Sequence, residues 1–506
     1  MPYLLGIDNG STVSKAALFD TAGNEIAVAG ASAETFYPHP GWTERSMEAL
    51  WQTTAQAIRA VLEKSGVNPR DIAGIGNTGH GNGLYLIDRH GQPVRNGIQS
   101  LDTRAASILE ERKKNDVQGR AFPYVLQEFW PAQPHALLQW IKYNEPEAYA
   151  RIGNILLCKD YIKFRLTGVV TSDYTDMSGT CLLDNVRRTY SRDLLELYDI
   201  PEMFGALPPL AQSFEVVGRV TQEAAEATGL AEGTPVVGGM YDVDAGALGA
   251  GVIEPGTLCM IAGSWSINEV IIERPVQDPA LAMVSVAMIP DHWLVLEGSA
   301  TSATNLEWFV NQFCAEERQE AQQRGISVYD VVNERVAGLS PGGTSVIFHP
   351  FLFGSNVQAS ARAGFYGVAG WHTKAHLLRA LYEGVVFSHL THVEKLLKLG
   401  PLSVARLTGG GARSEVWTQI FADALAMAME IPHGVEVSAR GVAMSAGIGV
   451  GVYRDHADAV RQAVRIVRRQ EPISANTPLY RARYAVYREL LDAMQKPWDT
   501  LSRLDA

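Results

Sequence analysis

Hydrophobic residues at the start of the chain first occur in short runs typical of strands and then at the spacing of a helix. An apolar run at residues 3–7 ends at an Asn-Gly dipeptide, a strong turn signal, and the pattern resumes at 16–19, which predicts a β-hairpin. A third strand is expected at 26–31. Apolar positions over 47–64 then recur at the spacing of an amphipathic helix. The chain is therefore predicted to open with an antiparallel meander followed by a helix.

A second strand–turn–strand pattern occurs about half a chain later. Apolar runs at 258–261 and 267–272 flank the polar segment 263–266, as the opening runs flank the first turn. Similar units at the head of each half predict two related α/β domains.

The join between the two domains is expected in the small-residue stretch 245–255, which is suited to a hinge. This predicts an N-terminal domain at 1–247 and a C-terminal domain at 248–506. In the second domain Thr373 is a suitable N-cap for a long helix. The charged and aromatic segment 478–503 is expected to form terminal helices.

The composition limits the class of protein. The sequence has 506 residues, more than one hydrophobic core accommodates, and 46% hydrophobic and 19% charged residues are ordinary for a globular enzyme. A net charge of -12 argues against nucleic-acid binding. No signal peptide and no membrane span are expected, because the first strand is acidic and no apolar run is long enough. Four widely spaced cysteines predict a reducing compartment, the cytoplasm: Cys158, Cys181, Cys259 and Cys314.

The phosphate-binding motifs of several kinase classes are absent from the sequence. It contains no G-x-x-x-x-G-K-[ST] loop and no protein-kinase signature. Glycine-rich hairpin turns are the remaining candidates, because small residues let backbone N–H groups approach a phosphate. The first turn offers Gly10, Ser11 and Thr12 with Lys15 nearby, and Asp8 before it is a candidate ligand of Mg²⁺. An ordinary hairpin is the alternative.

Two further candidate sites lie in the second half. The second turn repeats the first, and two such turns could hold a polyphosphate between them. A triple-glycine run follows an apolar strand and precedes a helix, where an adenine or ribose could lie against the backbone. A tight strand-to-helix connection explains that run equally well. The residues concerned are Gly263, Ser264, Gly410, Gly411, Ala412 and Ser414.

Two acidic residues stand in the small-residue stretch GGMYDVDAGALGAG. Asp242 and Asp244 are candidates for the carboxylate that accepts a hydroxyl proton during phosphoryl transfer. On an extended chain their side chains would point the same way, whereas at the start of a helix they would diverge. A second pair, His389 and His392, has ligand-like spacing, but without a third ligand nearby we expect core packing.

In this order, the motifs resemble the FGGY carbohydrate kinase family over nearly the whole chain. The blocks are GIDNGSTVSKAALFD, GWTERSMEALW, KDYIKFRLTG with SDYTDMSGTCLLD, VVGGMYDVDAGALGAG, AGSWSINE and LTGGGARSEVWTQIFAD. The resemblance implies an α/β fold of two ribonuclease H-like domains, of the actin, hexokinase and heat-shock ATPase superfamily, around an interdomain cleft. It also implies ATP as phosphoryl donor and Mg²⁺ as cofactor.

The resemblance assigns roles by position. Asp242 falls at the catalytic base, whereas the family requires no acid at Asp244. The two turns would hold the phosphates, and the triple-glycine run would hold the nucleoside. The N-terminal domain would bind mainly the sugar and the C-terminal domain mainly ATP. Sugar contacts are implied at Trp42, His80, Asn82, Asp102 and Arg104.

The sugar turn departs from familiar members at Gly81-Asn82. Glycerol kinases carry Arg-Glu there and D-xylulose kinases carry Met-His, so neither substrate is favoured. L-xylulose kinases have Gly-Lys, and PFLFGSN, YEGVVFSHLTH and TNLEWF also resemble them. A ketopentose such as L-xylulose is therefore the expected acceptor, with erythritol or another polyol as the alternative.

Two functions of other classes are also considered. A conformational ATPase like actin or the chaperone ATPases would keep the phosphate turns but need no Asp242. A sugar sensor without catalysis is disfavoured by the presence of Asp8, Asp242 and both turns. A homodimer, the commonest soluble assembly, stays open.

Overall fold

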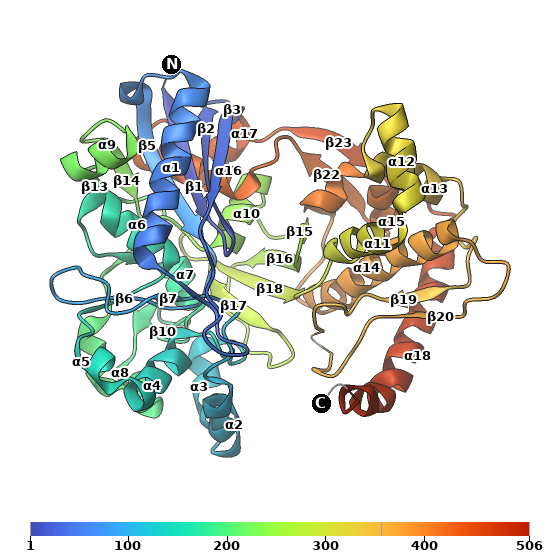
Figure 1. The fold of residues 1–506 in the computed structure, drawn as a ribbon, viewed down its shortest axis with the longest axis horizontal. Helices are drawn as coiled ribbons and strands as arrows, with labels where there is room; N and C mark the ends of the chain where they lie inside the picture. The colour runs from blue at the N-terminus through green and yellow to red at the C-terminus, as the bar shows by residue number, and fades with distance from the viewer. Residues whose placement is uncertain (1, 356, 505–506) are drawn as a thin grey trace. The chain divides into compact units, whose positions relative to one another are not determined.

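The computed structural model describes residues 2–355 and 357–504, which fall into two compact units. Figure 1 shows the ribbon with its labelled elements. Unit 1 comprises 1–253, 271–295 and 434–465, and unit 2 comprises 254–270, 296–433 and 466–506.

A six-stranded sheet forms the centre of unit 1, in the order β13-β14-β5-β1-β2-β3. β1, β5 and β14 are parallel, while β2 and β3 continue from β1 as an antiparallel meander. The parallel strands therefore bring their carboxyl ends to one edge of the sheet. The bounds are β1 (Tyr3–Asn9), β2 (Val13–Asp20), β3 (Glu25–Ser32), β5 (Ile72–Gly79), β13 (Val216–Arg219) and β14 (Pro235–Val237).

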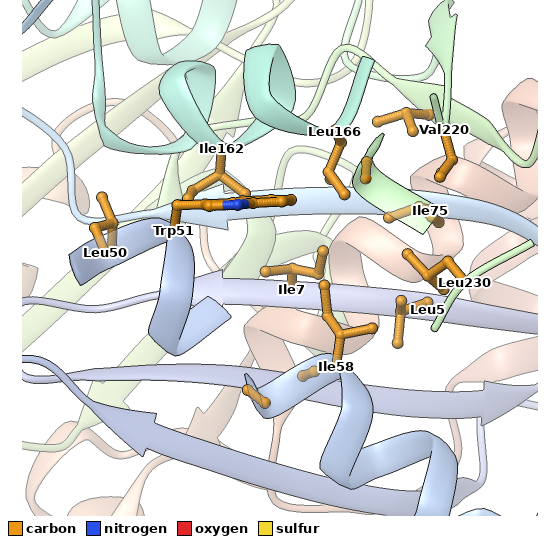
Figure 2. Packing of buried hydrophobic residues seen from close by; sticks show 14 of the residues in the cluster. Leu5, Ile7, Leu50, Trp51, Ile58, Ile75, Ile162, Leu166, Val220 and Leu230 are labelled. Carbon is orange, nitrogen blue, oxygen red and sulfur yellow. The ribbon is translucent and has the colours of Figure 1, made fainter. Parts of the chain in front are cut away.

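Successive residues of β1 point to opposite faces of the sheet of unit 1, and helices cover both faces. Leu5 and Ile7 belong to a core with Ile58 of α1 (Met47–Ser65) and Ile162 of α6 (Cys158–Thr167), as Figure 2 shows. Between them lies Gly6, and a Cβ there would stand 2.0 Å from the Ala439 carbonyl oxygen. α16 (Val437–Gly449) therefore lies directly against the backbone of β1.

The remaining part of unit 1 is built around a second hydrophobic core. Leu137, Ile141 and Ile155 are fully buried in it. Its elements, with those that flank the sheet, are β4 (Glu44–Arg45), β6 (Tyr85–Ile87), β7 (Gly97–Ile98), α2 (Ala106–Lys114), α3 (Val117–Val125), α4 (Pro134–Asn144), α5 (Pro146–Ala150), β8 (Asn154–Leu156), β9 (Ser172–Asp173), α7 (Tyr174–Ser178), β10 (Leu183–Asp184), β11 (Thr189–Tyr190), α8 (Arg192–Leu197), β12 (Leu210–Ala211), α9 (Gln222–Thr228), α10 (Asp242–Ala250) and α17 (His456–Ala463).

The second large sheet has the order β17-β18-β16-β15-β21-β22-β23. In this sheet β15 and β16 are an antiparallel pair, and the later strands β21 and β22 run parallel to β15. The same order occurs in unit 1, where the antiparallel pair β1-β2 is followed by the parallel strands β5 and β14. The prediction of two related α/β domains is confirmed. The bounds are β15 (Thr257–Ala262), β16 (Ser266–Ile272), β17 (Met283–Val286), β18 (Trp293–Ser299), β21 (Val404–Thr408), β22 (Ala428–Pro432) and β23 (Ile466–Gln470).

The predicted local elements agree with the structure. The hairpin, the third strand and the first helix occur as β1, β2, β3 and α1, and the helix after Thr373 is α14. The predicted terminal helices form one helix, α18. The helices and small strands of unit 2 are α11 (Thr304–Phe313), α12 (Ala315–Arg324), α13 (Val328–Ala337), β19 (Ile347–His349), β20 (Gly364–Tyr366), α14 (Lys374–Leu396), α15 (Glu415–Leu425) and α18 (Thr477–Ser502).

The predicted hinge at 245–255 is wrong for its first part. Residues up to Ala250 form α10, and a Cβ on Gly249 would lie 1.9 Å from the Val437 carbonyl oxygen. The small residues of this stretch let α10 and α16 pack closely within unit 1. The chain leaves unit 1 at Ile253, near the predicted boundary, but segments 271–295 and 434–465 also belong to unit 1, so the division differs from a contiguous one.

In the described residues, no helix is long and apolar enough to span a bilayer.

Candidate active site

Three adjacent strand ends bring the candidate residues of unit 1 together. Asp8 lies at the end of β1, and His80 directly follows β5. A short turn after β14 leads to Asp242, the first residue of α10. Because β1, β5 and β14 are parallel neighbours, these residues meet at one edge of the sheet, where open α/β sheets bind their ligands.

The pKa values of the Asp8 and Asp242 carboxyl groups are raised above the usual value for aspartate. Burial is the main cause, and it raises the pKa of Asp8 to about 6. Burial also raises the pKa of Asp242 to about 7, with a further contribution from the charge of Asp8, while the N–H groups of Val243 and Asp242 oppose the shift. Both side chains are partly exposed. A carboxylate that titrates near neutrality can accept a proton at physiological pH.

The turn that carries Asp242 is fixed by side chains from three directions. Thr78 donates to the Met240 carbonyl at 2.8 Å, and Lys163 donates to the Gly238 carbonyl at 2.7 Å. The Tyr241 N–H donates to the Thr175 hydroxyl oxygen at 2.8 Å. These hydrogen bonds to the backbone at Gly238, Met240 and Tyr241 hold the start of α10 in one position, which pre-organises Asp242.

A buried ion cluster lies beneath this turn. The Lys159 ammonium lies 2.6 Å from Asp160, 2.7 Å from Asp173 and 3.5 Å from Asp176. Burial raises the pKa of Asp176 well above its usual value, and the neighbouring carboxylates Asp173, Asp160 and Asp242 raise it further. The charged residues of the KDY and SDYTD blocks therefore form the ion cluster that packs under the turn.

Asp244 diverges from Asp242, as expected for residues at the start of a helix. It is fully buried and its Oδ1 accepts the Met288 N–H at 2.8 Å. Burial raises its pKa well above the usual value, which favours the protonated carboxyl. Asp244 therefore joins α10 to the segment that contains Met288, and Asp242 is the acid at the strand-end edge.

The first turn predicted to bind phosphate is anchored by a residue that the sequence reasoning missed. The Arg45 guanidinium donates to the Gly10 carbonyl at 3.2 Å and to the Ser11 carbonyl, and Gln99 donates to the Ser11 carbonyl at 2.8 Å. Both carbonyls are thus held on one side of the turn, with Thr12 exposed beyond them. Arg45 lies in the GWTERSMEALW block of the sequence. It is fully buried, and a buried guanidinium needs hydrogen-bond acceptors such as these carbonyls.

Lys15 pairs with a residue from the distant α16 segment. Its ammonium lies 2.9 Å from the Glu436 carboxylate, and the lysine side chain is 39% exposed. Lys15 is therefore anchored beside Asp8 within unit 1 while part of it remains accessible to an anion.

The predicted sugar residues fall into two groups, the first in the turn after β5. Asn82 has a φ of 58°, in the left-handed region. Its Oδ1 is buried and has no hydrogen-bond partner among residues 2–355 and 357–504. The His80 ring nitrogens contact the Gly81 carbonyl at 3.3 Å and the Tyr85 hydroxyl at 2.9 Å. Burial, helped by the charge of Arg45, lowers the pKa of His80 to about 4, so its ring is neutral.

The second group is a buried ionic cluster around Arg104. Its guanidinium lies 2.8 Å from Asp102 and 2.9 Å from Glu44, and it stacks over the Trp42 ring at 4.3 Å. Asp102 also accepts the Thr43 N–H at 2.7 Å. The structure thus unites Trp42, Asp102 and Arg104 and adds Glu44, which the sequence reasoning did not single out.

In unit 2, four of the predicted residues line one cavity of about 500 Å³: Gly263, Ser264, Gly410 and Ser414. The ends of the parallel neighbours β15 and β21 bring them together. Ser414 caps α15 by accepting the Trp417 N–H at 3.1 Å. Gly411 and Ala412, which follow Gly410 in the chain, are buried. The cavity is large enough for a nucleoside.

Aromatic residues from two other helices complete this cavity. The rings of Tyr382 and Trp417 pack in a tilted arrangement, with centroids 4.4 Å apart and an interplanar angle of 30°. The Asn333 Oδ1 accepts the Tyr382 hydroxyl at 2.8 Å and the Ser414 hydroxyl at 2.7 Å. Local patterns in the sequence did not connect these residues, because they meet only in the folded unit.

The residues at Asp8 fit a magnesium ion. Mg²⁺ keeps most of its waters and takes one or two carboxylates from the protein. Asp8 is a partly exposed carboxylate whose raised pKa reflects burial, which a bound cation would offset. The described part of the chain has no cluster of three or more His, Cys, Asp or Glu side chains suited to a metal. His389 and His392 are fully buried core residues, as expected.

Comparison with protein-family models decides the family. The model for the N-terminal domain of the FGGY family of carbohydrate kinases matches residues 3–249, and the model for its C-terminal domain matches residues 258–450. The chain belongs to the FGGY family of carbohydrate kinases. It is therefore an enzyme, and the sequence-based assignment to this family is confirmed.

Curated relatives of this FGGY kinase match over nearly its full length. The chain is 37% identical to the L-xylulose/3-keto-L-gulonate kinase of Escherichia coli K12 over 97% of both chains. It is also 37% identical to the probable L-xylulose kinase of Pasteurella multocida, over 98% of this chain and 99% of the relative.

Solved structures agree on the two-domain fold of the FGGY kinases. The xylulose kinase of Rhodospirillum rubrum superposes with a TM-score of 0.87 at 27% identity, over 98% of this chain and 100% of that one. The ligand-bound xylulose kinase of Lactobacillus acidophilus has a TM-score of 0.89 at 21% identity, over 99% and 100%. The second match supports the fold alone.

Proposed function

We propose that this FGGY kinase transfers the γ-phosphoryl group of ATP to a hydroxyl of a five-carbon ketose such as L-xylulose. The observation that carries the choice of sugar is the 37% identity to the Escherichia coli L-xylulose/3-keto-L-gulonate kinase over 97% of both chains. Erythritol or another polyol is the alternative acceptor.

The acceptor site belongs to unit 1 in this proposal. Asp242 is the general base, because it is the acid at the strand-end edge and its pKa is raised to about 7. The unpaired Asn82 Oδ1 accepts a sugar hydroxyl, since a buried carbonyl without a partner is costly. Trp42, Asp102 and Arg104 form an ionic and aromatic wall, and the neutral His80 supports the turn.

The nucleotide site is assigned mainly to the C-terminal domain, 248–506, and the sugar site mainly to the N-terminal domain, 1–247. Adenosine occupies the cavity lined by Gly263, Ser264, Gly410 and Ser414, and the buried Gly411 and Ala412 follow Gly410 in the chain. Gly10, Ser11, Thr12 and Lys15 contribute the phosphate turn of the N-terminal domain.

The reaction is a direct displacement. The acceptor oxygen attacks the γ-phosphorus as the bond from phosphorus to the ADP oxygen breaks, and the hydroxyl proton passes to Asp242. Turn N–H groups stabilise charge on the phosphoryl oxygens. Asp8 would hold Mg²⁺, which supplies charge neutralisation on the phosphates.

The test is an ADP-release assay over both enantiomers of xylulose and ribulose, together with tetritols, pentitols and glycerol. The proposal expects the highest kcat/KM for L-xylulose, at least tenfold above glycerol, because a site that hydrogen-bonds substrate hydroxyls discriminates against an acceptor that lacks some of them. A higher kcat/KM for a tetritol would transfer the assignment to the alternative acceptor. ATP turnover that no acceptor stimulates would contradict the proposal.

We also propose a cytoplasmic location, which the four free and buried cysteines support. A homodimer is the proposed assembly, on the ground that dimers are the commonest soluble oligomers. Light scattering of the purified chain tests it.

A further inference from the structure

The turn that carries Asn82 leaves no room for a side chain at position 81. A Cβ added to Gly81 would lie 1.9 Å from Cε2 and 2.6 Å from Cζ of the Tyr241 ring. The φ of Gly81 is outside the left-handed region, unlike those of Asn82 and Gly83. The backbone conformation at 81 therefore does not require glycine. The Tyr241 ring requires it, because the ring occupies the space of a Cβ.

The Tyr241 ring has little freedom to move away. On its other side, a Cβ on Gly179 would lie 3.2 Å from Cε1. The Tyr241 N–H is held by the Thr175 hydroxyl at 2.8 Å, and the residue is 8% exposed. Two glycines from separate segments thus accommodate one aromatic ring at a fixed position.

This contact joins the two segments that carry acceptor-binding groups in the proposed function. Tyr241 immediately precedes Asp242, and its ring contacts Gly81, which immediately precedes Asn82. The Asn82 Oδ1 is buried without a partner among the described residues. The Tyr241 ring therefore lies against the turn that carries Asn82, while its backbone leads directly into Asp242.

We propose that Tyr241 is a specificity-determining residue, an aromatic wall that limits the length of the acceptor to that of a ketopentose. This inference rests on the proposed function, in which Asp242 and Asn82 contact the sugar. A rigid ring excludes additional carbons by occupying their volume, and its face packs against the C–H groups of the sugar. One methylene in such a pocket changes discrimination by about 10–200-fold.

The first test measures kcat/KM for a ketopentose and for the ketohexose with the same configuration at its reacting end. In Tyr241→Ala the ratio of ketohexose to ketopentose kcat/KM should rise at least tenfold, with a smaller rise in Tyr241→Leu. Tyr241→Phe keeps the ring and should keep the wild-type ratio. Equal fold-losses for both sugars in the Ala and Leu variants would overturn the proposal.

A double-variant cycle tests the steric coupling without relying on catalysis. Gly81→Ala in the wild-type background should lower Tm by several degrees, because its Cβ meets the ring. The same change in the Tyr241→Ala background should lower Tm by less than one degree. Additive shifts would overturn the coupling between the two positions.

The two experiments separate failure of this inference from failure of the proposed function. If the wild-type enzyme phosphorylates no sugar, the proposed function fails and Tyr241 loses its role toward an acceptor, even if the Tm shifts are non-additive. If the wild type is active but its acceptor ratio is insensitive to Tyr241, the specificity proposal alone fails.

Discussion

The turns after β1 and β15 occupy equivalent places in their sheets but carry different chemistry. Gly10-Ser11 in unit 1 corresponds to Gly263-Ser264 in unit 2, and each turn lies beside the end of a parallel neighbour strand. The first turn follows Asp8-Asn9 and is held by Arg45. The second follows Ile261-Ala262 and opens onto a cavity of about 500 Å³.

The difference shows how one architecture serves two tasks. In unit 1 the strand ends gather carboxylates, Asp8 and Asp242, whose pKa values are raised toward neutrality. In unit 2 the corresponding edge gathers glycine backbone and aromatic rings around the cavity. Proton transfer is thus expected to depend on unit 1 and nucleotide affinity on unit 2, which the following variants test.

The largest effect is expected for the base of unit 1. Asp242→Asn removes the proposed proton acceptor and should lower kcat by about 10²–10⁴-fold, with KM for ATP changed less than threefold. Asp244→Asn is the matched control: its Oδ1 accepts the Met288 N–H, and an amide oxygen of the same shape can accept that bond, so kcat should stay within about fivefold. Similar losses in both variants would remove the distinction between the two acids.

A variant of unit 2 should have the opposite kinetic signature. Gly410 lines the cavity, and a Cβ there meets no atom within 4 Å, so Gly410→Leu should fold normally. The added side chain occupies volume in the proposed nucleotide cavity and should raise KM for ATP by about 10–100-fold, with KM for the sugar unchanged. Steady-state kinetics with each substrate varied in turn check this. An unchanged KM for ATP would place the nucleotide elsewhere.

The anchor of the first turn should contribute to stability as well as to affinity for ATP. Arg45→Met leaves the Gly10 and Ser11 carbonyls without their guanidinium partner, which should cost about 1–3 kcal/mol of unfolding free energy and lower Tm. Arg70→Met, at an exposed site, is the control. If both variants melt at the same temperature, Arg45 does not anchor the turn.

The smallest effect concerns stability against pH. The native pKa of Asp242 is raised to about 7, so the folded chain keeps a proton that the unfolded chain loses between about pH 4 and 7. Its contribution to stability therefore falls as pH rises through that window. Without metal or nucleotide, Asp242→Asn should stabilise the protein more at pH 8 than at pH 5, by on the order of 2 kcal/mol. Thermal melts measure this, with exposed Asp71→Asn as control for the lost charge.

Local patterns were sufficient for the opening hairpin, the third strand, the first helix and the helix after Thr373. Alternating apolar runs and an Asn-Gly turn predicted β1 and β2, and the resemblance of short blocks assigned Asp242. Long-range packing was not predictable in this way. α16 lies against β1 through Gly6, and its small residues gave no indication in the sequence of which sheet they would pack on.

The supports of the site were missed for the same reason. Tyr241 and Gly81 are in contact although they are far apart in the sequence, and neither has a motif of its own. Arg45 holds the Gly10 carbonyl from another segment. Such contacts and hydrogen bonds form only in the tertiary structure. The spacing of hydrophobic residues, by contrast, indicates only which residues share a face of one helix or strand.

The central claim is that the acceptor hydroxyl loses its proton to Asp242, whose pKa is raised to about 7. The most direct test is the pH dependence of kcat/KM for L-xylulose at saturating MgATP, between pH 5.5 and 8.5. We predict a rise approaching tenfold per pH unit at the acid end, a midpoint within about one unit of 7, and a plateau above it. The Asp242→Asn variant should retain only a small residual rate without this dependence. A flat wild-type profile, or the same midpoint in Asp242→Asn, would contradict the account.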